Sequence, residues 1–290
     1  SGSDVSIGKT GNITVKLPDG TDLDAKHQVT VIVTDHKKAP QQGKNVAVKG
    51  DLGQSAAGKT DKKGELTVPE VEQTERHGVY IVGYTDGTFG PSRSMTRSEA
   101  AAIFARLLAE KNGDTISTAA NTKFADIPAH AWYSGYVKYL SNNGITYGKS
   151  KTIFAPNDAI TRAEFTTMAV RFFDVYGDGD AEIMEQFSGF NDVSSGYWAA
   201  EYIKYAALHG WINGYGDGSF HADREINRAE VVTIVNRLLG READEDYIAD
   251  NLRKLNTFPD VSRKHWAYYA VMEAANAHTA VLGENESWSK

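Results

Sequence analysis

The chain has 290 residues, of which 41% are apolar and 24% charged, a globular composition with enough apolar side chains to bury cores in about two domains. Its net charge of −7 argues against a nucleic-acid partner, which favours a basic surface. The absence of cysteine excludes disulfides and thiolate zinc sites, and no apolar run approaches the about 20 residues that span a bilayer.

Residues 11–70 follow the pattern of a small all-β domain. Apolar residues alternate with polar ones in four short runs, at Ile13, Val15 and Leu17, at Val29, Val31 and Val33, at Val46 and Val48, and at Leu66 and Val68. This alternation predicts half-buried strands in a β-sandwich. The stretch VAVKGDLGQSAAGKTDKKGELTVP resembles bacterial immunoglobulin-like surface modules. Residues 1–10 are interpreted as a tag or linker, and the charged, apolar-poor residues 71–78 as a second linker.

The remainder, 79–290, contains two motifs that recur at fixed spacing. F-x-D-x5-W occurs as Phe124-Asp126-Trp132, Phe190-Asp192-Trp198 and Phe258-Asp260-Trp266. A Gly, a Phe and then [T/N]-R-x-E occur as Gly83-Phe89-Arg97-Glu99, Gly148-Phe154-Arg162-Glu164 and Gly214-Phe220-Arg228-Glu230. A repeat of about 65 residues predicts three copies of one supersecondary unit. Apolar residues at helical spacing predict two helices in each copy, joined by a Gly-rich loop.

The three copies are expected to close into a ring. Copy two covers 122–175 and copy three covers 188–240, whereas copy one is split into 79–110 and 255–279. A half copy without its partner helix would leave an apolar stripe in water, at a cost of about 25 cal/mol per Å². We therefore predict that the Trp266 helix packs against the segment from Tyr80 to Leu108.

The [T/N]-R-x-E motif predicts a helix start, with Thr or Asn as N-cap and Glu completing a capping box. The cation after the cap is disfavoured, because a helix N-terminus already carries partial positive charge. Two interpretations stay open from the residues alone. Each arginine pairs with loop Asp86 or Asp217 or with the capping Glu, or it binds an anionic ligand together with free helix amides. The arginines concerned are Arg97, Arg162 and Arg228.

Other residues have a structural and a functional interpretation. Trp132, Trp198 and Trp266 could stack on sugars, but their spacing to later Tyr residues is more often that of a helix core. The motif aspartates are more often turn or capping groups than ligands. The eight histidines show no metal-ligand spacing, and the acidic stretch at Asp174, Asp178 and Asp180 lacks the EF-hand glycine. We expect no metal, cofactor or catalytic residue.

The repeats resemble the S-layer homology module of Gram-positive surface proteins. FADIPAHAWYSGYVKYLSNNGI, GYTDGTFGPSRSMTRSEAAAIFARLL and INRAEVVTIVNRLL carry the likeness. The resemblance implies a multidomain chain, whose β module precedes a mainly α, pseudo-threefold spindle with a central three-helix bundle. It also implies a secondary cell-wall polysaccharide as ligand, whose pyruvate ketal supplies a carboxylate to Arg97, Arg162 and Arg228.

The family's loop motif carries over to Gly83, Asp86 and Gly87 and to Gly214, Asp217 and Gly218. We expect these glycines to let backbone amides approach a sugar. Copy two departs from the motif, with Lys151 and Thr152 at the Asp-Gly positions, so the Arg162 groove is predicted to bind the ligand most weakly of the three.

The predicted function is non-covalent anchoring of a secreted S-layer or surface protein to the cell wall, with possible self-association in the S-layer and neither nucleic-acid binding nor membrane insertion. The alternatives are an enzyme acting on wall glycan and a purely structural self-assembly module.

Overall fold

The computed structural model describes residues 12–16, 29–34, 42, 45–49, 55–59, 62–63, 65–68, 74–176, 187–281 and 286–289. The chain divides into two compact units, one of residues 1–75 with 281–285 and one of 76–280 with 286–290. The acidic residues Asp178 and Asp180, considered above for calcium, lie outside the described residues.

The described part of the first unit contains five short strands. They are β1 (Asn12–Lys16), β2 (Val29–Thr34), β3 (Asn45–Lys49), β4 (Ser55–Lys59) and β5 (Glu65–Val68). Four of them lie at the predicted alternating runs, whereas β4 has no such pattern. β1, β2 and β5 form an antiparallel sheet in the order β1-β2-β5, and β3 pairs with β4. The register places Val31 opposite both Val15 and Leu66. An immunoglobulin-like sandwich stays a prediction.

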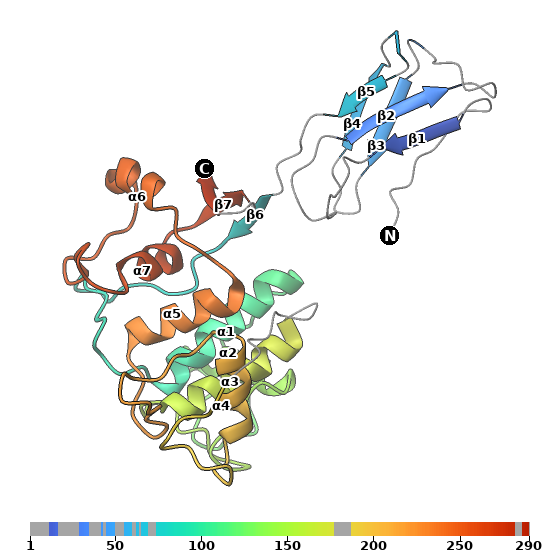
Figure 1. Ribbon diagram of the computed structural model, residues 1–290. Helices are drawn as coiled ribbons and strands as arrows, with labels where there is room; N and C mark the ends of the chain where they lie inside the picture. Colours follow the sequence, from blue (N-terminus) through green and yellow to red (C-terminus); the bar gives the residue numbers. More distant parts are fainter. Residues whose placement is uncertain are drawn as a thin grey trace. The chain divides into compact units, whose positions relative to one another are not determined.

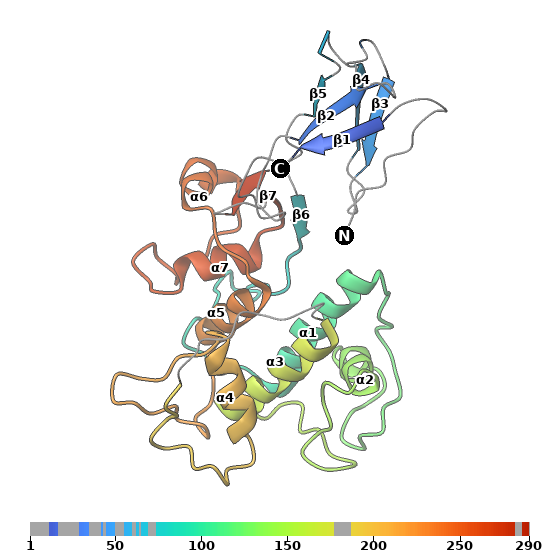
Figure 2. The same cartoon turned by 45° about the vertical axis from the view of Figure 1, so that its right-hand side comes forward.

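The second unit is mainly helical (Figures 1 and 2). The [T/N]-R-x-E motifs open α1 (Arg97–Asn112), α3 (Arg162–Tyr176) and α5 (Arg228–Leu239). The tryptophan motifs precede α2 (Ser134–Asn142), α4 (Ala200–Leu208) and α7 (Tyr268–Ala275). α6 (Glu245–Asn251) and the 3-10 helix η1 (Leu252–Lys254) lie between α5 and α7. No helix of the described residues has the length and apolar composition of a membrane span.

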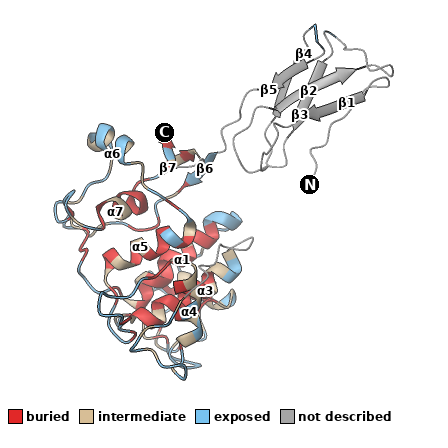
Figure 3. Ribbon diagram, viewed as in Figure 1, coloured by how far each residue is buried: buried red, intermediate tan, exposed pale blue. Residues whose placement is uncertain are grey.

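The helices α1, α3 and α5 occupy the interior of this unit. They are buried on most of their surface, whereas α2, α4 and α7 each pack against the preceding motif helix (Figure 3). The Phe104 ring on α1 lies 5.3 and 4.9 Å from the rings of Phe165 and Phe172 on α3. The predicted capping boxes are present at the starts of α1 and α5, and the same two bonds join Thr161 and Glu164 at the start of α3.

Three backbone hydrogen bonds form a closed cycle just before the motif helices. Met95 N–H donates to Ile226 O at 2.9 Å, Ile226 N–H to Ile160 O at 3.0 Å, and Ile160 N–H to Met95 O at 2.9 Å. Each of these residues is two positions before a motif arginine. The three copies are therefore joined in a cyclic, pseudo-threefold order.

The two halves of copy one are held together by the last motif aspartate. Asp260 accepts hydrogen bonds from the N–H groups of Phe89 at 2.9 Å and Gly90 at 2.7 Å. Asp126 and Asp192 hold the equivalent loop positions in copies two and three. Tyr80 N–H also donates to Ala274 O of α7 at 3.3 Å. The predicted packing of the Trp266 helix against the Tyr80 segment is confirmed.

A small sheet also joins the ends of this part of the chain. It has the order β6-β7-β8, with β6 at Thr74–His77, β7 at His278–Val281 and β8 at Ser287–Ser289. The linker predicted at 71–78 therefore contains a strand. The sequence TERH has no alternating apolar pattern, and its strand depends on pairing with β7, about 200 residues later.

Candidate functional site

Each motif arginine reaches into the loop of the next copy. The Nε–H groups of Arg97, Arg162 and Arg228 donate to the carbonyl oxygens of Phe154, Phe220 and Phe89 at 2.8, 2.9 and 2.8 Å. The three arginines are only 4%, 5% and 4% exposed. Copy one thus contacts the loop of copy two, copy two that of copy three, and copy three that of copy one.

The same arginines form ion pairs with a capping glutamate of the neighbouring copy. The Nη1–Oε1 distance is 3.0 Å for Arg97–Glu164 and 3.1 Å for Arg162–Glu230, and it lengthens to 3.9 Å for Arg228–Glu99. Pairing with a capping glutamate was one of the two open interpretations, and the structure places it between copies rather than within one. A buried arginine with such a partner stabilises the contact between copies only while the pair stays intact.

The loop aspartates organise their own loops. Asp86 accepts from the backbone N–H and the hydroxyl of Thr88, and Asp217 does the same with Ser219. The hydroxyl bonds, followed by the backbone bonds, lower the pKa of both carboxyl groups. These bonds stay within each loop, so they do not support the alternative in which the loop aspartates pair with the motif arginines.

The amides at the helix N-termini are occupied. In α1, Arg97 N–H donates to Asp158 O and Ser98 N–H to Pro156 O, each at 3.0 Å, and Glu99 N–H donates to its own N-cap at 3.2 Å. α3 and α5 repeat the two contacts to the neighbouring copy. The expectation of free helix amides for an anion is therefore wrong, because the ring arrangement uses them to join the copies.

The Arg162 site consists of Arg162, Tyr215, Arg224, Glu230 and Trp266. These residues line two adjoining hollows of about 250 and 530 Å³ that share Tyr215, Glu230 and Trp266. The Glu230 carboxylate receives bonds from both arginines and, at 3.0 Å, from the Tyr215 hydroxyl. Burial lowers the pKa of Arg162, while Tyr215 and Glu230 act in the opposite direction. The site therefore already concentrates two guanidinium groups around one carboxylate.

The Arg228 site consists of Arg228, Tyr84, Arg93 and Glu99. The Tyr84 ring lies 4.1 Å from the Arg93 guanidinium and 4.7 Å from that of Arg228. Arg93 and Arg224 both lie ten residues after the loop glycine, and sequence reasoning missed them. Their common spacing was the available signal. Arginine stacks on aromatic faces and presents a planar fork to carboxylates.

The Arg97 site is different. It consists of Arg97, Lys149, Asp158 and Glu164, with Lys149 and Asp158 at the positions of the loop tyrosine and second arginine. Their salt bridge is 2.9 Å long. The divergent loop of copy two therefore belongs to Arg97 and not to Arg162, and the prediction for the Arg162 groove is wrong in this respect. Proximity in sequence pairs each arginine with the loop of its own copy, and the cyclic arrangement moves that pairing by one copy.

The motif tryptophans lie at the surface. Trp132, Trp198 and Trp266 are 52%, 57% and 64% exposed, so the predicted role in the helix core is wrong. Each precedes its helix by two residues and lies in a turn, where the helical spacing to later tyrosines does not decide its direction. Of the three, Trp266 lines both hollows of the Arg162 site.

The loop glycines are needed for packing. A Cβ atom at Gly83 would lie 2.5 Å from Cε1 of Phe258, and one at Gly214 would lie 2.5 Å from Cε1 of Phe190. Gly87 and Gly218 have φ values of 82° and 80°, the left-handed conformation that favours glycine. Asp217 lines the larger hollow. The loop shape thus follows from phenylalanine packing and turn geometry.

Comparison with known proteins adds to this geometry. A model described as "S-layer homology domain" matches residues 61–101, 123–166 and 189–232. The chain is 34% identical over 218 residues to Cell surface glycoprotein 1 of Acetivibrio thermocellus, covering 72% of this chain and 9% of that protein. It is 30% identical over 233 residues to the Cellulosome-anchoring protein of the same species, covering 80% of this chain and 49% of that protein. Exoglucanase XynX of Acetivibrio thermocellus is 32% identical over 159 residues, which cover 55% of this chain and 14% of that enzyme.

The chain spans less than half of the length of each of these relatives. Each of the three family matches ends within the first residues of a motif helix, and the matches include Arg97, Arg162 and Arg228. The recurring motifs, their cyclic hydrogen bonds and the family matches agree, and this chain contains three S-layer homology repeats.

Proposed function

We propose that the chain anchors a larger surface protein to the cell wall by binding an anionic secondary wall polysaccharide, with a pyruvate ketal as the preferred acidic group. The observation that carries the proposal is the Arg162 site, where two arginines, a tyrosine and an exposed tryptophan line one hollowed surface. A carboxylate matches the arginine fork, and a sugar face matches the indole. The related surface and cellulosome-anchoring proteins indicate a secreted, cell-wall-associated location.

The acidic group is proposed to meet Arg224 rather than Arg162. The Arg162 guanidinium is buried and bonded to two carbonyls and Glu230. The Arg224 side chain is 41% exposed, and its side-chain bonds to described residues both use Nη2, which leaves the Nε and Nη1 donors for a ligand. Arg93 has the equivalent position in the Arg228 site. We therefore expect the Arg162 and Arg228 sites to bind the polysaccharide more tightly than the Arg97 site.

The test is co-sedimentation of the full chain with purified wall sacculi, before and after extraction of the secondary polymer. Loss of one charge-assisted bond is worth about 1.5–3 kcal/mol, so Arg224→Ala should weaken binding about tenfold to a hundredfold. Arg93→Ala, Arg224→Ala together should weaken it further, because two sites contribute avidity. Arg224→Lys should restore little, and Arg253→Ala, an exposed arginine elsewhere, should bind like the parent protein.

Wild-type binding by the Arg93→Ala, Arg224→Ala variant would refute these sites. Equal binding to extracted sacculi would refute the polymer as ligand and favour the self-assembly alternative. The enzyme alternative predicts release of soluble fragments from the same sacculi. The match to the exoglucanase covers only 14% of that enzyme, which supports a shared non-catalytic module.

A further inference from the structure

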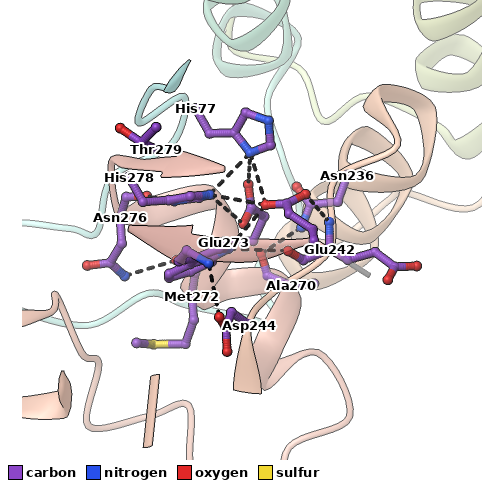
Figure 4. Close-up of polar contacts among 12 residues, drawn as sticks. His77, Asn236, Glu242, Asp244, Ala270, Met272, Glu273, Asn276, His278 and Thr279 are labelled. Atoms are coloured by element: carbon purple, nitrogen blue, oxygen red, sulfur yellow. Dashed lines mark hydrogen bonds and ion pairs between the residues drawn. The ribbon is translucent and has the colours of Figure 1, made fainter. Parts of the chain in front are cut away.

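A buried cluster of two histidines and two glutamates lies where the two ends of the second unit meet. His77 comes from β6, Glu273 from α7, His278 from β7, and Glu286 immediately precedes β8. The side chains of His77, Glu273, His278 and Glu286 are 3%, 0%, 3% and 6% exposed. Figure 4 shows His77, Glu273 and His278 turned toward one another. The polysaccharide sites described above use none of these residues.

We propose that this cluster is a binding site for one divalent transition-metal ion of the zinc class. One ligand atom from each of the four residues lies within 4.8 Å of the others. Nδ1 of His77 is 3.1 Å from Glu273 Oε1, 3.2 Å from His278 Nε2 and 3.3 Å from Glu286 Oε1. His278 Nε2 is 3.3 Å from both Glu273 Oε2 and Glu286 Oε1.

These separations match the edges of a tetrahedral zinc site. Imidazole nitrogens and carboxylate oxygens bind zinc at about 2.0–2.2 Å, and a tetrahedron with such bonds has edges of about 3.3–3.5 Å. The five distances above, which involve both oxygens of Glu273, fall at or just below that range, and one ligand atom from each residue lies within 4.8 Å of the others. Two imidazoles favour a transition metal over calcium or magnesium, which prefer oxygen ligands.

Hydrogen bonds within the cluster do not give every nitrogen and oxygen atom a suitable partner. His278 Nδ1 lies 2.9 Å from the Asn276 carbonyl and must donate to it, so in the neutral ring Nε2 is an acceptor. That acceptor faces two carboxylate oxygens. If both histidines are protonated instead, two N–H donors oppose each other across the 3.2 Å between His77 and His278. A metal ion accepts the lone pairs of both rings and balances both carboxylates.

Glu273 provides a further sign of a missing ligand. It is 1% exposed, and its Oε2 atom lies 3.3 Å from His278 Nε2 but accepts no hydrogen bond from any described residue. A buried carboxylate oxygen without such a bond is costly, and a coordinated cation removes the cost.

The surroundings resemble the second shell of a metal site. Glu286 Oε1 accepts from the Trp288 indole at 3.1 Å, and its Oε2 accepts from Glu242 N–H at 3.0 Å. The Trp288 ring stacks on His278 with 3.8 Å between centroids. Bonds of this kind fix ligand orientation and tautomer, and the indole shields the site from water.

A metal here would join residues about 200 positions apart and tie together the two ends of the second unit. Because such a site forms only in the folded chain, metal binding should stabilise folding.

The test uses the untagged full chain, dialysed against a chelator and then titrated with Zn²⁺. We expect one Zn²⁺ per chain by calorimetry and elemental analysis and a higher melting temperature of the second unit. With Co²⁺ we expect the intense visible absorption of a tetrahedral nitrogen-oxygen site. Failure of the wild-type chain to bind Zn²⁺, or binding of Ca²⁺ with equal affinity, would overturn the proposal.

Variants locate the site. His278→Ala and Glu273→Gln should each abolish stoichiometric binding and the melting shift, whereas His130→Ala, at an exposed histidine, should leave both unchanged. Glu286→Gln keeps an acceptor for the Trp288 indole, so it remains informative if His278→Ala fails to fold. One bound Zn²⁺ in folded Glu273→Gln and Glu286→Gln alike would overturn the assignment.

Discussion

The ring closure makes Asp260 the most informative residue to change. In Asp260→Ala, the N–H groups of Phe89 and Gly90 lose an acceptor that lies 170 residues or more away in sequence. Two charge-assisted bonds set an upper value of about 3–6 kcal/mol. Asp260 is exposed, so water replaces part of this interaction, and we expect a loss of about 2 kcal/mol in the free energy of unfolding.

The measurement is urea unfolding followed by tryptophan fluorescence, since all five tryptophans lie in the second unit. A loss of about 2 kcal/mol corresponds to a melting temperature lower by about 4–8 °C for a unit of this size. Asp250→Ala, at an exposed aspartate of α6, is the control. An Asp260→Ala midpoint equal to that of the control would refute the closure of the ring by this side chain.

Three further substitutions test the loops. Gly214→Ala places a Cβ 2.5 Å from the Phe190 ring and should lower the free energy of unfolding in urea by about 1–3 kcal/mol. Gly216→Ala, where the added Cβ meets open space, is the control, and equal losses in the two variants would contradict the packing role. Ala155 has φ 59°, so Ala155→Gly should gain up to about 1 kcal/mol, and a lower urea midpoint would argue against strain there. Desolvation alone would raise the pKa of Asp192, but two backbone N–H donors outweigh it and lower that pKa. The ionised Asp192 side chain therefore contributes its full share to the free energy of unfolding above the ordinary carboxyl pKa near 4, and this share is lost as the pH falls through the lowered pKa. Asp192→Asn should thus make the stability less dependent on pH in the acid range. An unchanged acid dependence would count against this role.

The sequence determined by itself the features that depend on neighbours along the chain. The spacing of F-x-D-x5-W and [T/N]-R-x-E specified three copies. The Thr96 and Asn227 capping boxes specified where helices begin, because both partners of a capping box lie three residues apart. The complementary half copies also predicted the closure of the ring.

Only the tertiary structure decided the contacts between distant segments. Arg162 faces the loop of copy three because the copies are joined in cyclic order, and that choice of partner has no local signal. Trp266 is exposed because it lies in the turn before its helix, beyond the reach of helical periodicity. His77 and His278 show no metal-ligand spacing, and they meet only because β6 pairs with β7. Local propensity acts over a few residues, whereas these contacts depend on which surfaces the folded ring brings together.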